Sequence, residues 1–269
     1  MLRIGCQTYT WEMLGERWTG TADDLLGSIA AGGYSGIEIT NKMIGSYAAR
    51  PKDFAAVLKT HGLDLIAFAW ASDSGFTEPA AFDADLAAAE RVLDFVAQFP
   101  GAVLSLGSAT IMSAGDKTGK FAAAARIYNA IGALGQRMGV DVAFHPSSHH
   151  NTLLGTGDEY ARIMALTDHA VIGWVPDTGH ILRGGMTLVE TVTLYRDRVR
   201  YLHLKDVDSR GHWQMLGEGV CDTRAVVEAV SSAPHFNGWI VAEEESDVAA
   251  ADPGTAVRRN RETLRQLLG

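Results

Sequence analysis

Runs of apolar residues alternate with helix-like stretches along almost the whole chain. Eight runs rich in Val, Ile, Leu or aromatic residues predict β-strands, at 2–8, 36–40, 63–70, 102–107, 140–145, 171–176, 199–204 and 238–243. Between them, Ala- and Leu-rich stretches with helical spacing predict helices, at 21–32, 52–61, 82–98, 120–138, 156–167, 187–196, 222–233 and 254–267. The pattern therefore predicts one strand followed by one helix, eight times over.

Eight strand–helix units in a chain of 269 residues predict a (β/α)8 TIM barrel, formed as a single domain over 1–269. A doubly wound open sheet also alternates strands and helices, but it usually has a glycine-rich first turn. Here QTYTWEM follows the first predicted strand, and GxGxxG is absent there. The sequence therefore favours the barrel, in which catalytic groups lie at the carboxyl ends of the strands.

Four predicted strands of the second half each end at a side chain that can bind a metal ion. The segments are VAFHPSSHH, GWVPDTGH, YLHLKD and GWIVAEEE. If the strand ends converge, His145, Asp177, His203 and Glu243 would form a mixed nitrogen and oxygen site. Such a ligand set predicts one divalent ion, which could be Mn, Co, Mg, Fe or Zn.

Each of these residues also has a simpler interpretation. Asp177 could cap the following turn, and His203 could be a core histidine bonded to a carbonyl group. Glu243 begins a charged triplet, which is most often a solvated loop. Four such strand ends in succession favour the metal site, because a shared ion removes the cost of burying unpaired charges. His149 is a rival to His145 as the fourth ligand.

Three residues near these ligands are predicted to take part in catalysis. Lys205 shares a strand face with His203 and could stabilise negative charge on a substrate oxygen. Glu245 lies two residues beyond Glu243 and could act as a base. His180 is the alternative base. A surface ion pair with Asp206 would explain Lys205 equally well.

Other residues near the strand ends are candidates for binding the substrate. Glu38 lies in the second predicted strand, and His149 follows the fifth. Trp11 and Trp213 lie in or near loops predicted at the same end of the barrel, as does Trp70. An aromatic face packs well against the apolar face of a sugar ring. The loop 207–221 is longer than a typical connection between a strand and a helix and is a candidate lid.

Composition narrows the partners of the protein. The formal net charge of −9 opposes binding to nucleic acid, because phosphate backbones attract clustered Lys and Arg. No apolar run reaches the ~18–20 residues that span a bilayer. The N-terminus reads as a strand and has no export signal, so we expect a cytoplasmic protein in which Cys6 and Cys221 are free thiols. The sequence does not determine the oligomeric state, and a homo-oligomer is compatible with it.

Several motifs of the second half occur together in one known group of enzymes. DTGH, HLKDV, the G-x-G-x-x-D of GEGVCD, and GWIVAEEE followed by Asp247 stand in that order. With them, the chain resembles the sugar phosphate isomerase/epimerase superfamily with the xylose-isomerase-like barrel. It is most similar to inosose (2-keto-myo-inositol) dehydratases. The resemblance is strongest from about residue 139 to the C-terminus. The first half resembles the superfamily loosely, through the segment AGGYSGIEI.

The resemblance implies that strands five to eight hold one divalent ion, with Asp177, His203 and Glu243 at the matching motifs. Strand five usually supplies a glutamate in the epimerases, whereas His145 stands at the matching position here, as in the dehydratases. We therefore expect a lyase or dehydratase that acts on a small keto-sugar or keto-cyclitol. It would remove an α-proton and eliminate a β-substituent through a metal-stabilised enediolate.

Two other enzyme classes use the same barrel. A sugar epimerase or isomerase would share the metal site and the first proton transfer, and would differ by returning the proton instead of losing a leaving group. An apurinic endonuclease would need several metal ions and a DNA-binding surface, which the acidic balance opposes. A non-catalytic sugar-binding barrel would gain nothing from four ligands around an ion.

Overall fold

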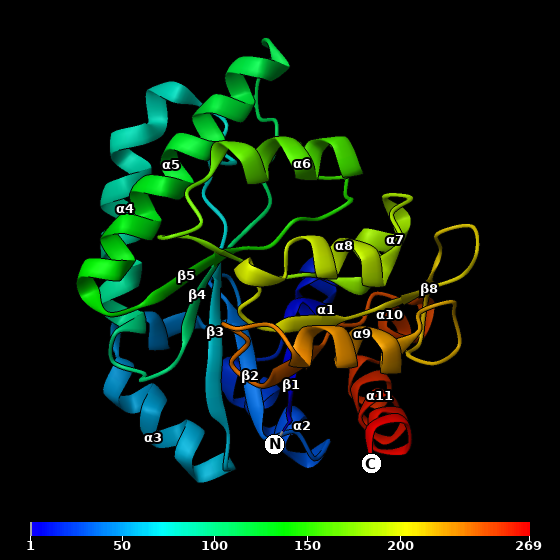
Figure 1. Cartoon of the computed structure of the whole chain (residues 1–269). Coiled ribbons are helices and arrows are strands. Elements are labelled where there is room, and N and C mark those ends of the chain that lie inside the picture. The colour runs from blue at the N-terminus through cyan, green and yellow to red at the C-terminus, as the bar shows by residue number, and fades with distance from the viewer. Residues whose placement is uncertain (1) are drawn as a thin grey trace.

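The computed structural model describes residues 2–269 and contains an eight-stranded parallel sheet. Its strands are β1 (Arg3–Gln7), β2 (Gly36–Thr40), β3 (Asp64–Trp70), β4 (Val103–Leu106), β5 (Asp141–Phe144), β6 (Gly173–Trp174), β7 (Leu202–Leu204) and β10 (Trp239–Ala242). They follow the order β6-β5-β4-β3-β2-β1-β10-β7. Figure 1 shows helices arranged around this curled sheet. The predicted TIM-barrel fold is confirmed.

Two isolated backbone bridges connect the edge strands β6 and β7. One pairs Trp174 with Val199, and the other pairs Asp177 with His203. The His203 N–H donates to the Pro176 carbonyl oxygen at 2.9 Å. Proline has no N–H to give to a ladder, which accounts for the short β6 and the interrupted pairing. The sheet therefore closes at residues of the ligand-bearing end.

The outer helices lie where apolar periodicity predicts them. They are α2 (Ala22–Ala31), α3 (Pro51–His61), α4 (Phe82–Val96), α5 (Lys117–Met138), α6 (Gly157–Leu166), α8 (Leu188–Leu194), α9 (Thr223–Ser231) and α11 (Pro253–Leu268). A capping box between Thr21 and Asp24 begins α2. Gly62 and Gly139 end α3 and α5 in the left-handed conformation, at φ of 65° and 72°.

The pattern of apolar residues did not predict the short elements at the carboxyl ends of the strands. The helices α1 (Tyr9–Glu12), α7 (Thr178–Arg183) and α10 (Asp247–Ala251) come soon after β1, β6 and β10. The predicted loop 207–221 contains most of a small antiparallel hairpin of β8 (Asp206–Val207) and β9 (Trp213–Gln214). Each of these elements is too short to show a helical or strand period.

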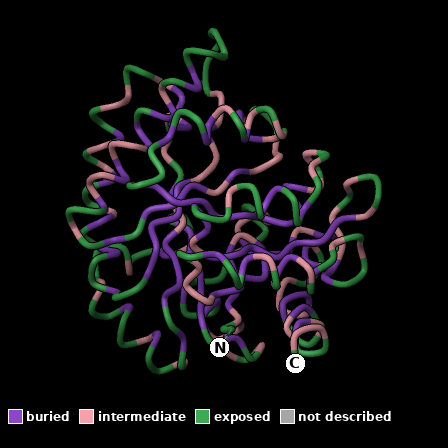
Figure 2. Tube along the Cα trace, in the orientation of Figure 1, coloured by how far each residue is buried: buried purple, intermediate pink, exposed green. Residues whose placement is uncertain are grey.

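The core has two layers. A small cluster that includes Ile66, Val103, Tyr201 and Val241 fills the barrel interior. A larger cluster fills the space between the sheet and the helices. In Figure 2 the buried residues follow the central strands, and exposed residues follow the outer helices. Within residues 2–269, no helix is long and apolar enough to cross a membrane.

Asp206 organises the loop that carries the hairpin. Its buried carboxylate accepts the N–H groups of Val207 at 2.9 Å, Gly217 at 3.0 Å, Gly219 at 3.1 Å and Cys221 at 2.9 Å. Hydrogen bonds to a charged acceptor are among the stronger ones in proteins. The carboxylate therefore replaces the backbone pairing that this segment lacks.

We expect Asp206→Ala to lower the free energy of unfolding by about 2–4 kcal/mol, because several buried N–H groups lose their acceptor. Urea unfolding followed by circular dichroism measures the change. Asp208→Ala is the matched control, since Asp208 bonds to Arg210 and His212 within the same exposed turn. Equal stability losses in the two variants would contradict the role of Asp206.

Candidate metal centre

Four side chains from successive strand ends meet at one end of the barrel. His145 follows β5, Asp177 follows β6, His203 lies in β7 and Glu243 follows β10. Each offers one ligand atom, and these atoms all lie within 4.8 Å of one another. Asp177, His203 and Glu243 are buried, and His145 is mostly buried. The predicted convergence of the strand ends is therefore observed, with His145 in the group and His149 outside it.

The distances within this cluster leave two buried atoms without a partner. His145 Nε2 lies 3.4 Å from Asp177 Oδ2, and His203 Nδ1 lies 3.7 Å from the same oxygen. His203 Nδ1 lies 2.8 Å from Glu243 Oε2. Neither His145 Nε2 nor Asp177 Oδ2 has a hydrogen-bond partner within residues 2–269. Because unpaired buried polar atoms are destabilising, facing nitrogen and oxygen atoms of this kind fit a shared cation.

Hydrogen bonds to neighbouring groups orient two of these ligands, Asp177 and His203. Asp177 is the N-cap of α7, and its Oδ1 accepts the His180 N–H at 2.9 Å, so Oδ2 is left to face the cluster. His203 Nε2 lies 2.6 Å from Glu38 Oε2, which leaves Nδ1 directed at the other ligands. Gln7 Nε2 donates to Glu38 at 3.0 Å. A carboxylate behind a ligand histidine is the usual way to fix its ring in metal sites.

Charges around the cluster keep both carboxylates ionised. Burial raises the pKa of Glu243, but the Lys205 ammonium and His203 outweigh it and hold the pKa at about 2. Burial likewise opposes ionisation of Asp177, yet His180 and Lys205 hold its pKa well below the usual range. The cluster therefore presents two anionic ligands and two imidazoles.

The three predicted catalytic residues meet beside the cluster. Lys205 Nζ contacts Glu245 Oε1, lies 2.7 Å from Glu243 Oε1, and lies 3.2 Å from His180 Nε2. Burial lowers the Lys205 pKa, but Glu243 and Glu245 raise it more, so the side chain is an ammonium. Burial raises the Glu245 pKa, while Lys205 and then His149 bring it down to about 2.

His149, His180 and Glu245 form a second group whose ligand atoms lie within 4.8 Å of one another. The Lys205 ammonium contacts Glu245 and His180 of this group, and it also contacts Glu243 of the first cluster. The two groups differ in their unpaired atoms: within residues 2–269, His145 Nε2 and Asp177 Oδ2 are buried without a partner, and no side-chain atom of the second group is. The first cluster is accordingly the better candidate for a metal ion.

His180 is held in one tautomer. The backbone N–H of Ser148 donates to its Nδ1 at 3.0 Å, so the ring proton of the neutral imidazole belongs on Nε2. Burial and the nearby Lys205 ammonium hold the His180 pKa well below its usual range. The side chain therefore offers a hydrogen-bond donor next to Lys205.

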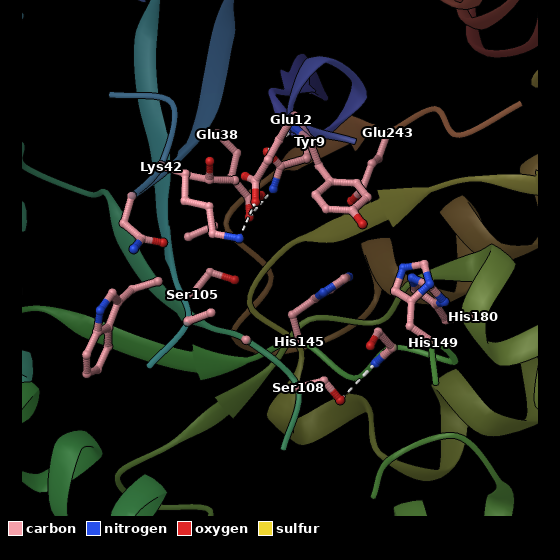
Figure 3. Close-up of a pocket in the computed structure, with 18 residues that line it drawn as sticks. Tyr9, Glu12, Glu38, Lys42, Ser105, Ser108, His145, His149, His180 and Glu243 are labelled. Carbon is pink, nitrogen blue, oxygen red and sulfur yellow. Dashed lines mark hydrogen bonds and ion pairs between the residues drawn. The ribbon is translucent and has the colours of Figure 1, made fainter. Parts of the chain in front are cut away.

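An open pocket lies over the cluster, with about 690 Å³ of empty space that includes part of the surrounding solvent. His145, Glu243, His149, His180 and Glu38 all line it, and Figure 3 labels them. The pocket thus joins members of both groups of side chains.

Of the three tryptophans predicted near the strand ends, Trp70 lines the pocket, and Trp11 and Trp213 are not part of its lining. Trp11 is 1% exposed and packs in the core against Trp18, so it does not reach the pocket. Trp213 lies on β9 with its ring 4.8 Å from Lys205 Nζ and edge-on to His180, behind the polar groups. Trp70 and Tyr9 line the pocket.

Tyr9 and Glu12 also line the pocket, and the sequence pattern did not single them out. The one-turn helix α1 places residues three apart on the same side, which brings Tyr9 and Glu12 to the pocket and turns Trp11 away from it. Burial raises the Tyr9 pKa to about 12, so its hydroxyl is protonated. The QTYTWE segment after β1 would have given this signal if it had been taken as a helical turn.

Comparisons with known proteins agree with this fold. A sequence model of the family described as xylose isomerase-like TIM barrel matches residues 27–267. Inosose dehydratase of Geobacillus kaustophilus (strain HTA426) is 32% identical over 151 residues, 49% of this chain and 48% of that protein. Inosose dehydratase of Lacticaseibacillus casei is 26% identical over 267 residues, 87% of this chain and 85% of that protein. The chain spans about half the length of the first curated relatives that it matches.

Two solved structures are similar over the whole chain. The IOLI protein with a bound zinc atom has a TM-score of 0.79 and 14% identity, covering 99% of this chain and 98% of that one. The 3-keto-D-glucoside 4-epimerase YcjR from E. coli has a TM-score of 0.77 and 18% identity, covering 99% and 100%. At these identities the likeness is one of fold.

We expect His145→Ala to weaken metal binding by at least about 100-fold, because it removes a direct ligand. His149→Ala should keep one bound ion, because His149 lies outside the cluster. Metal content after dialysis, measured by mass spectrometry, and zinc affinity from chelator competition check both variants. Loss of metal from His149→Ala with normal metal in His145→Ala would reverse the two assignments.

Proposed function

Because this chain belongs to the xylose isomerase-like TIM barrel family, we propose that it is a divalent-metal-dependent lyase acting on a keto-sugar or keto-cyclitol. The observation that carries the proposal is the contact between a buried metal-type cluster and the Lys205–Glu245 pair, in which Lys205 Nζ lies 2.7 Å from Glu243 Oε1. Similarity to inosose dehydratases favours elimination.

His145, Asp177, His203 and Glu243 would hold the ion. Two imidazoles and two carboxylates suit Mn, Co, Fe, Zn or Mg. When bound, such an ion supplies a Lewis acid that polarises a substrate carbonyl and makes the neighbouring C–H group acidic. The chain then has to supply a base, donors for the developing negative charge, and a path for the leaving group.

Glu245 is our candidate for the base. In this structure Lys205 holds its pKa at about 2, which is too low for efficient proton abstraction from carbon. A substrate oxygen that accepts the hydrogen bonds of Lys205 would release Glu245 from this ion pair. The carboxylate is mostly buried, so its pKa would then rise and its basicity with it.

Lys205 and His180 are our candidates for holding negative charge on the substrate oxygen. Lys205 is an ammonium, and His180 carries its proton on Nε2, 3.2 Å from Lys205 Nζ; two donors cannot hydrogen-bond to each other, and a substrate oxygen beside them would accept from both. Preorganised donors at developing charge are a large source of catalysis. The same tautomer makes His180 unsuitable as the base through Nε2, which favours Glu245.

Elimination then needs a proton for the departing oxygen. The α-proton moves to Glu245, a carbon–carbon double bond forms, and the β carbon–oxygen bond breaks. His149 Nε2 lies 3.5 Å from Glu245 Oε1 on the open side of the pocket, where it can hand a proton to the leaving group. Its place in the pocket lining also suits the substrate contact predicted for it.

A sugar epimerase or isomerase is the second candidate. The similar structure of a 3-keto-D-glucoside 4-epimerase favours it, and the same cluster and base would serve. The two reactions differ after the proton is removed. In the epimerase or isomerase the proton returns to carbon, whereas in the lyase a substituent leaves. Mass spectrometry of the products of keto-sugars and inososes separates them, because only elimination loses water or an alcohol.

We expect the α-hydrogen of a substrate to exchange with deuterated water, or its deuteration to slow turnover. Glu245→Gln should keep its metal and lose about 10²–10⁴-fold in exchange rate, because an amide cannot take the proton. His180→Ala should still exchange, more slowly, because it lacks one donor. Proton exchange by NMR and metal analysis are measured on the same samples.

If hydrogen exchange survives in Glu245→Gln and disappears in His180→Ala, His180 is the base and Glu245 is not. A wild-type protein that converts a keto-sugar with neither exchange nor an isotope effect would remove the stepwise mechanism. Hydrolytic attack by an activated water would then explain turnover better.

A further inference from the structure

The pocket over the cluster adjoins a second cavity that the proposed reaction does not use. This outer groove holds about 1140 Å³ of empty space, which includes part of the surrounding solvent. Glu12 and Lys42 line both the pocket and the groove, so these two side chains form the boundary between them. Figure 3 shows them on the Glu38 side of the pocket, across from His149 and His180.

Glu12 is incompletely satisfied at this boundary. Its Oε1 lies 3.2 Å from Lys42 Nζ, whereas its Oε2 is buried without a hydrogen-bond partner within residues 2–269. The Glu12 side chain is 16% exposed, while that of Lys42 is 70% exposed. A carboxylate oxygen that is buried and unpaired is costly, and a hydroxyl donor from a ligand would satisfy it. The exposed Lys42 can move aside with little loss.

The walls of the outer groove are aromatic and hydroxyl-rich. Trp18 and Tyr47 are partly exposed aromatic residues, and Thr21 and Ser46 add hydroxyl groups. The Tyr47 hydroxyl donates to Asp23 Oδ1 at 2.8 Å. Aromatic surface combined with oriented hydroxyl and carboxylate groups is a lining that suits the apolar faces and hydroxyl edge of a sugar ring.

We propose that the outer groove binds a second sugar ring, linked by a glycosidic bond to the keto-ring that lies at the cluster. A hydroxyl of this glycoside would donate to Glu12 Oε2 where the ligand passes from one cavity to the other. The proposal rests on the proposed function, which it deepens by naming a keto-glycoside as the substrate class and the second sugar as the leaving group.

The chemistry balances for a glycoside whose ketone is at C3. The C2 proton moves to Glu245, a double bond forms between C1 and C2, and the glycosidic C1–O bond breaks. The electron pair of that bond stays on the departing oxygen, which takes a proton and leaves as the free second sugar. No oxidant or reductant is needed.

Equilibrium binding tests the groove without turnover. Isothermal titration of the zinc-loaded Glu245→Gln protein compares 3-keto-glucose with a disaccharide whose non-reducing glucose is oxidised at C3. We expect the disaccharide to bind at least about tenfold more tightly, which is the contribution of roughly one well-packed ring. Equal affinity for the two sugars would overturn the proposal.

Variants of the groove show where the preference arises. Adding Trp18→Ala should remove most of the preference for the disaccharide and leave the affinity for 3-keto-glucose within about twofold, because Trp18 lines the groove and not the pocket. Adding Glu12→Gln should also reduce the ratio of the two affinities, because the buried carboxylate oxygen is lost. Trp18→Phe, which keeps a ring and is a safer change beside Trp11, should retain part of it. Arg196→Ala, an exposed change near α8, is the matched control. A preference that survives in both groove variants would also overturn the proposal.

The two proposals fail in different ways. Tight binding of the disaccharide without conversion of any keto-sugar by the wild-type protein would remove the lyase and keep the groove. Conversion of 3-keto-glycosides with no binding preference for the second ring would keep the lyase and remove the groove.

Discussion

The backbone bridge between Asp177 and His203 does two things at once. It joins the edge strands β6 and β7 at the carboxyl end of the barrel, and it sets two ligand-type side chains next to each other. Pro176 prevents a continuous ladder here, so the closure is confined to a few residues. Asp177 also begins α7 as its N-cap. Closure of the fold and assembly of the cluster are therefore one structural event.

Charge balance is the second constraint on this end of the barrel. Asp177, Glu243 and Glu245 are held ionised in a buried region, and Lys205 is the cation that touches two of them directly. Burial lowers the pKa of His203, but the carboxylates of Glu38, Asp177 and Glu243 raise it well above its usual value, so this ring is a second cation. These two cations do not balance Asp177, Glu243 and Glu245 fully, and His145 Nε2 and Asp177 Oδ2 lack partners within residues 2–269. A divalent ion in the cluster would correct both deficits, and Lys205 would then be freed in part for a substrate oxygen.

The alternation of strands and helices could be predicted from the sequence, because eight apolar runs and eight helical stretches are long enough to show their periods. It also brought the four ligand candidates together, since the carboxyl ends of parallel strands meet in a barrel. Their number and order along the chain were more informative than any one of them. His145 and His149 could not be separated by spacing alone, because the choice depends on where β5 ends.

Contacts made by short or irregular elements could not be predicted. The one-turn helix α1 buries Trp11, which was expected at the substrate, and brings Tyr9 to the pocket instead; a single turn is too short to show a helical period. A register shift in β2 accompanies the inward position of Glu38, which bonds to His203 across 165 positions of sequence. The tautomer of His180 depends on the Ser148 N–H, a contact from a loop without regular structure.

The central claim is that the cluster of His145, Asp177, His203 and Glu243 is where one divalent ion binds. Anomalous X-ray diffraction at the zinc edge, from crystals grown with zinc, tests it most directly. Our account predicts one strong peak per chain, about 2.0–2.2 Å from His145 Nε2, Asp177 Oδ2, His203 Nδ1 and a Glu243 oxygen. No peak among these four side chains, or a peak among His149, His180 and Glu245 instead, would contradict it.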